Sequence, residues 1–229
     1  MENNDKNVDV LKQAAEFILT GKPEEAGAII EKLYPFIPMK SLEFPEMPAI
    51  ASDEVKDTSS FFIQTVRSSN IKKDDRKYTE VEQMEQFFKD GFIDRYFGTK
   101  LINSGLLRLI SEKLPVEFPY HPHWKMEECH IAYWYYQPTM DHIIPISLGG
   151  KNQLSNWITT SMKWNMVKNN YRLEQLNWQL YPEGNIQEWD GLSKLFVKIV
   201  EKEPKLKHVK RINDWYKATK IVLEKYSLL

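Results

Sequence analysis

The sequence predicts an α+β protein in which a small strand–loop–strand–helix unit is embedded in helices. Three observations indicate this fold. Apolar residues at helical spacing mark an N-terminal helical hairpin in residues 8–34, and residues 139–171 combine two strand-like runs with a capped helix. Helical patterns flank that unit on both sides. The chain of 229 residues, 42% of them hydrophobic, is long enough for one sizeable domain with an appendage.

The N-terminal hairpin is predicted from two helical patterns and the break between them. Gly21-Lys22-Pro23 ends the first helix and starts the second, because proline suits the first turn of a helix. Such a hairpin docks either on the core of its own chain or on a partner, which includes a second copy of the chain. Residues 35–58 contain four prolines and no clear period, so residues 1–70 are predicted to be a hairpin followed by an extended linker.

Further elements follow in order along the chain. A helix is expected from Thr79 to a stop near Gly91, and a second, buried helix within residues 100–114. His130–Tyr136 is rich in aromatic residues and predicts a strand. After the central unit, residues 173–178, 186–200 and 206–223 are predicted to form three helices.

Charge and cysteine content limit the classes of function. Residues 141–229 hold 14 Lys and Arg against 9 Asp and Glu, whereas residues 1–140 hold 17 against 23. The basic half suits a polyanionic partner, although an unevenly charged solvated surface explains it equally well. The single cysteine, Cys129, excludes an internal disulfide and fits a reducing compartment. No signal peptide and no apolar run of about 18 residues is present, so we expect a cytoplasmic protein without a membrane span.

Residues 139–171 bring together the residue types that hydrolyse phosphodiesters. A β-branched run follows Asp141-His142, a Gly149-Gly150 turn follows that run, and a second strand-like piece spans residues 157–160. Ser161 can cap a helix that presents Asn165 and Lys168 on one face. The end of the first strand is therefore expected to lie against that helical face.

The chemistry of these side chains points to a metal-assisted hydrolase. A carboxylate and an amide oxygen are hard ligands that suit Mg²⁺ or Mn²⁺. An adjacent neutral imidazole can take a proton from water at neutral pH. Because neighbouring side chains of a strand point to opposite sides, one group can face the metal and the other the attacking water.

This pattern resembles the HNH, or ββα-metal (His-Me finger), endonuclease family. The resemblance rests on Asp141, His142, Pro145, Gly149-Gly150, Asn156, Asn165 and Lys168, which stand at the family's spacing. It implies that Asp141 and Asn165 ligate one Mg²⁺ or Mn²⁺ ion and that His142 is the general base. It also implies that Asn156 ties the loop together and helps to orient the histidine. Lys168 either contacts a phosphate of the substrate or lies on the plain surface of the helix.

A second resemblance lies upstream, where FFKDGFIDRYFGTKL at residues 87–101 is similar to the metal knuckle that precedes the core in many HNH proteins. Asp94 and Phe97 stand where that knuckle has two cysteines, so no structural zinc is expected. Packing of Phe92, Tyr96 and Phe97 would have to hold the loop instead. The HNH nuclease domain is therefore predicted to span residues 78–229, with its core at residues 139–171.

The sequence thus predicts a metal-dependent endonuclease that hydrolyses phosphodiester bonds, with DNA favoured over RNA. His130 is a candidate for reaching the substrate, although structural packing is the alternative for it. Two other functions stay open: a catalytically silent nucleic-acid-binding module, and an effector subunit that acts with a partner docked through residues 1–70. The biological role, whether restriction, anti-phage defence, homing or repair, is left open by the sequence.

Overall fold

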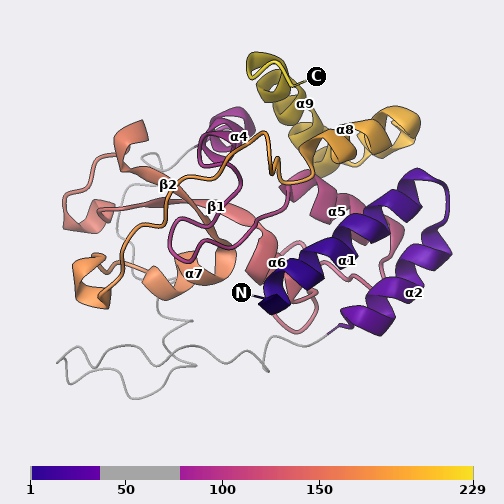
Figure 1. The fold of residues 1–229 in the computed structure, drawn as a ribbon, viewed down its shortest axis with the longest axis horizontal. Helices are drawn as coiled ribbons and strands as arrows, with labels where there is room; N and C mark the ends of the chain where they lie inside the picture. The colour runs from indigo at the N-terminus through magenta and orange to yellow at the C-terminus, as the bar shows by residue number, and fades with distance from the viewer. Residues whose placement is uncertain (1, 37–77, 229) are drawn as a thin grey trace.

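A computed structural model describes residues 2–36 and 78–228, and the statements below concern those residues. The predicted α+β fold is confirmed: helices surround one two-stranded antiparallel sheet. The hairpin of α1 and α2 lies at one end of the molecule, and the sheet lies towards the other (Figure 1). Most of the predicted linker lies outside the described residues.

The N-terminal hairpin consists of α1 (Glu2–Leu19) and α2 (Pro23–Leu33), as predicted. Gly21 makes the turn between them with φ +78°, a left-handed conformation that glycine adopts without steric cost. The apolar side of α1 packs against α5 (Ser104–Lys113) and α8 (Ser193–Lys202), so the hairpin docks on its own chain.

Polar side chains join the helices of the core. α4 (Glu80–Lys89) begins at Thr79 with a capping box, and it packs against α9 (Lys210–Lys225). Asn103 caps α5 by accepting the Gly105 N–H at 2.8 Å, and its amide donates to Ser193 and Thr219 at 3.0 Å each. One buried amide therefore connects the starts of α5 and α8 with α9.

The sheet and the following helix form the predicted ββα unit. β1 (Pro138–His142) pairs with β2 (Trp157–Ser161) in a register that sets His142 opposite Trp157. α7 (Met162–Lys168) follows β2 without a loop, because the Ser161 hydroxyl accepts the Trp164 N–H at 3.3 Å.

Four expectations for local structure were wrong. β1 ends at His142, and the run after it turns at Pro145 into a short 3-10 helix at Ile146–Leu148 instead of extending. The predicted strand at residues 130–136 is instead the short helix α6 (Ala132–Tyr136), whose aromatic rings are mostly buried in the core, so packing overrides their strand preference. Residues 173–178 contain only a 3-10 turn, at Glu174–Leu176, and α8 starts at Ser193 rather than near Ile186.

None of the described helices is both long enough and apolar enough to cross a membrane.

Candidate active site

Asp141 and His142 end β1, and their side chains have separate surroundings. The Asp141 carboxylate accepts hydrogen bonds from the Tyr96 hydroxyl (2.6 Å, to Oδ2) and from the His142 backbone N–H (2.7 Å, to Oδ1). The Lys168 ammonium lies 3.0 Å from the same Oδ2. Both strand residues are nearly buried, at 9% and 8% exposure. The carboxylate is therefore held on three sides by donors before any metal is considered.

His142 faces a different set of groups. Its Nε2 lies 3.0 Å from the Tyr78 hydroxyl and 3.0 Å from Asn152 Oδ1. The Trp157 indole N–H donates to the same Asn152 oxygen at 2.9 Å. Because an indole nitrogen only donates, the Asn152 atom between the two rings is an acceptor, which favours the His142 tautomer with its hydrogen on Nε2. The lone pair of the neutral imidazole is then on Nδ1.

Asn165 lies against β1 beside the Asp–His pair. Its amide nitrogen donates to the Thr139 hydroxyl at 2.9 Å and to the Met140 carbonyl at 3.2 Å. Both amide hydrogens are therefore used on the strand, one of them on the residue that precedes Asp141. This anchoring leaves the side-chain oxygen of Asn165 as the atom that can act as a ligand.

Lys168 does not lie on the plain surface of α7. Its side chain is fully buried, and its ammonium donates to the His142 carbonyl at 2.7 Å while it pairs with Asp141. A buried ammonium needs such partners, since removing its charge from water is costly. The cation points at the end of β1, and its contact with a substrate phosphate stays a prediction.

Asn156 braces the loop between the strands. Its Oδ1 accepts the Ile144 N–H at 2.8 Å, and its Nδ2 donates to the carbonyls of Ile144 and Lys151 at 2.9 and 3.0 Å. The loop starts directly after His142, so this brace fixes the backbone on which the histidine sits. The side chain next to the His142 ring, however, is Asn152.

The knuckle-like loop is held by a buried carboxylate as well as by aromatic rings. Asp94 is 0% exposed and accepts four hydrogen bonds, from the N–H groups of Tyr96 and Phe97 and from the Thr160 hydroxyl and the Ser161 N–H of β2. Burial raises the pKa of Asp94, although these bonds favour its charged form. Asp94 thus ties the loop to β2 by hydrogen bonds.

Aromatic packing places the same loop over α7. Phe97 stacks on Trp164 with ring centroids 3.9 Å apart, and Trp178 packs edge-on against Phe97 at 5.0 Å. Tyr96 is almost fully buried, and burial together with the Asp141 carboxylate holds its pKa well above the ordinary value. Its hydroxyl therefore keeps its proton and donates to Asp141.

His130 does not join this site, so the suggestion that it reaches the substrate is corrected. Its ring is fully buried and stacks on Phe118, its Nε2 bonds to the Tyr34 carbonyl at 3.0 Å, and its Nδ1 accepts the Ala132 N–H at 3.1 Å. Burial lowers the pKa of His130 to about 4. It is a core histidine that connects the hairpin to α6.

Three contacts of the site were not foreseen from the sequence. Tyr78 and Asn152 reach His142, and Tyr96 reaches Asp141, across separations of 64, 10 and 45 residues. Tyr96 belongs to the knuckle-like loop, so its place in that motif was the one signal that could have suggested a position near the core. No sequence pattern marks the other two.

The donor set fits a hard divalent cation. Asp141 and Asn165 offer a carboxylate and an amide oxygen, from neighbouring positions on β1 and α7. Mg²⁺ commonly takes one or two protein oxygens and keeps water or phosphate oxygens for the rest. Within the described residues no group of three or more His, Cys, Asp and Glu side chains is placed to hold a metal.

Comparison with known proteins agrees with this geometry. Residues 126–161 match the family described as HNH endonuclease. No curated protein and no solved structure matches the chain. The match covers both strands with Asp141, His142 and Asn156, and it stops at Ser161, the residue before α7. The match to β1, β2 and the loop between them suggests a nuclease, since HNH nucleases use divalent metal ions and act on nucleic acid.

Proposed function

We propose that this protein is a metal-dependent endonuclease that hydrolyses the phosphodiester bonds of DNA, with His142 as general base and one Mg²⁺ or Mn²⁺ ion held by Asp141 and Asn165. The observation that carries the proposal is the position of Asn165, whose amide is hydrogen-bonded to the residue before Asp141. A helix residue 24 positions along the chain is thereby set beside the Asp–His pair.

Each residue of the candidate site has its own role in this proposal. His142 accepts the proton of the attacking water at Nδ1, since Nε2 carries the hydrogen that faces Asn152. Asp141 and Asn165 hold the cation, and Tyr96 keeps the carboxylate oriented. The bound ion supplies charge neutralisation at the phosphate and at the departing oxygen. Asn156 keeps the loop after His142 in place.

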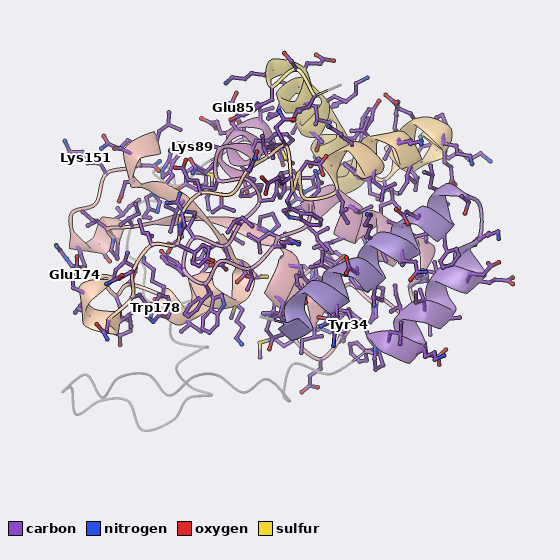
Figure 2. The ribbon with its side chains drawn as sticks, in the orientation of Figure 1. Tyr34, Glu85, Lys89, Lys151, Glu174 and Trp178 are labelled. Carbon is purple, nitrogen blue, oxygen red and sulfur yellow. The ribbon has the colours of Figure 1, made fainter. Side chains whose placement is uncertain are left out.

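The surface beside the site suits a polyanion. Residues 142–173 contain four Lys and Arg and no Asp or Glu. Two of these cations, Lys151 and Arg172, are exposed, and Lys151 lies at the outer edge of the molecule, in the loop between the strands (Figure 2). Arg172 donates to the Leu148 carbonyl of the same loop at 3.3 Å. Phosphates that approach this loop meet positive charge without a nearby carboxylate in the same segment.

The test is cleavage of supercoiled plasmid with Mg²⁺ or Mn²⁺, with EDTA as the metal-free control. His142→Ala should slow cleavage by roughly 10²–10⁴-fold while DNA binding stays within about two-fold. His208→Ala is the matched control, because that histidine is exposed and lies in the turn before α9. Asp141→Asn and Asn165→Ala should raise the metal concentration that half-maximal cleavage requires.

Unchanged cleavage by the His142 variant would refute the assignment of the base. Single-stranded DNA and RNA assayed in parallel decide the substrate class. If the wild-type protein binds DNA but cuts none of these substrates with either metal, the chain is instead a silent binding module or needs a partner.

A further inference from the structure

The ammonium of Lys168 is fully buried and lies beside Asp141, the carboxylate that would also hold the metal ion. Lys168 ends α7, and its Nζ lies 3.0 Å from Asp141 Oδ2 and 2.7 Å from the His142 carbonyl oxygen. The exposed fraction of its side chain is 0%, and that of Asp141 is 11%. Among the described residues Asp141 is the acid that pairs with this cation.

Asp141 does not depend on Lys168 alone for its orientation. The Tyr96 hydroxyl and the His142 N–H still donate to its two oxygens when the ammonium is removed. A neutral side chain at position 168 therefore leaves the carboxylate held by these two donors, and changes mainly the positive charge beside it.

We propose that Lys168 is the resident counter-ion of Asp141, which weakens the binding of a divalent cation until a phosphate of the substrate arrives. This inference rests on the proposed metal site. Two cations that share one carboxylate repel each other, and in a largely buried site salt screens that repulsion little. A phosphate group beside the metal offsets the excess positive charge, so substrate and metal each strengthen the binding of the other.

Mn²⁺ binding to the free protein, measured by electron paramagnetic resonance and by calorimetry, tests the proposal without nucleic acid. Lys168→Met removes the charge at nearly constant volume, and Lys168→Gln also keeps a donor for the His142 carbonyl. Both variants should bind Mn²⁺ at least about ten-fold more tightly than the wild type. The energy of that change is a modest part of the repulsion expected between charges a few ångströms apart. The tightening should disappear when Asp141→Asn is added.

Lys163→Met is the matched control. Lys163 lies on the same helix and is 6% exposed, but its ammonium lies against Tyr135 and Trp164, 4.6 and 4.7 Å from their ring centroids. Its variant should keep the wild-type Mn²⁺ affinity within about two-fold, because its ammonium packs on these two rings, whereas that of Lys168 lies 3.0 Å from Asp141. If Lys168→Met does not fold, Lys168→Gln carries the test, with the Mn²⁺-induced rise in Tm as a second measure.

The outcomes separate this inference from the proposed function. Wild-type binding that requires Asp141, without tightening in the Lys168 variants, overturns the role of Lys168 and leaves the metal site intact. Equal tightening in the Lys163 variant overturns it too, since a general charge effect is then sufficient. If neither the wild type nor any variant binds Mn²⁺, both the counter-ion role and the metal site fail.

Discussion

Replacing Asp94 tests how this chain holds the knuckle-like loop of residues 87–101. Its carboxylate is fully buried and accepts four hydrogen bonds, at 2.9, 3.2, 3.1 and 2.7 Å, two from its own loop and two from β2. Asp94→Ala removes all four acceptor contacts at once. Three backbone N–H groups and one hydroxyl then lack their partner inside the protein.

The expected loss in the free energy of unfolding is about 4 kcal/mol for Asp94→Ala. Each buried donor left unsatisfied costs roughly 1–3 kcal/mol. The total stays below the sum of four such costs, because the loop relaxes, water enters, and a charge no longer has to be buried. Asp94→Asn keeps one acceptor oxygen but turns an amide NH₂ towards N–H groups, so about 2 kcal/mol is expected for it.

Urea denaturation followed by tryptophan fluorescence measures both losses. Asp214→Ala is the matched control, since Asp214 pairs with the exposed Lys210 on the surface of α9 and should contribute less than about 1 kcal/mol. A loss for Asp94→Ala no larger than that of the control would show that aromatic packing alone holds the loop. The hydrogen-bond account would then be wrong.

Three further predictions concern single side chains around the site and the core. Burial lowers the pKa of His130 to about 4, so between about pH 6.5 and about pH 4 this histidine is protonated in the unfolded chain but neutral in the folded chain. Stability should therefore fall by up to about 3 kcal/mol as the pH drops from about 6.5 to about 4, and denaturation of His130→Gln across this range should show a smaller drop. Tyr96→Phe keeps the ring but loses the 2.6 Å bond to Asp141, and denaturation should show a loss of about 2 kcal/mol. Asn152→Leu removes the acceptor at His142 Nε2, so kcat for cleavage should fall about ten-fold with KM unchanged, whereas Asn152→Asp, which keeps an acceptor, should retain most of the activity.

The parts of the fold that follow local rules could be predicted from the sequence. The break at Gly21 and Pro23 marks the hairpin, and Ser161 marks the start of α7, because each acts through its immediate neighbours. β2 was placed correctly within one residue. The residue types of the candidate site likewise form a motif in the sequence, since metal-assisted hydrolysis needs particular residues at a particular spacing.

The parts that depend on distant contacts could not be predicted. α6 has the composition of a strand, yet its rings pack into a core to which α1, α2 and α5 contribute. The place of His130 depends on Tyr34, which is 96 residues away. Lys168 looks like an ordinary basic residue near a helix end, and its buried contact with Asp141 exists only because β1 and α7 meet.

The geometry of the site depends on the junction at Ser161, where the match to the HNH family ends. Ser161 is the last residue of β2, it caps α7, and its N–H donates to Asp94 at 2.7 Å. Asn165 and Lys168 follow four and seven positions later, so both lie on the helical face that starts at the cap. A shift of one residue at this junction would rotate the helix by about 100° and turn both side chains away from Asp141. The buried Asp94 holds that register through its bonds to Thr160 and Ser161, and so helps to keep Asn165 and Lys168 beside Asp141.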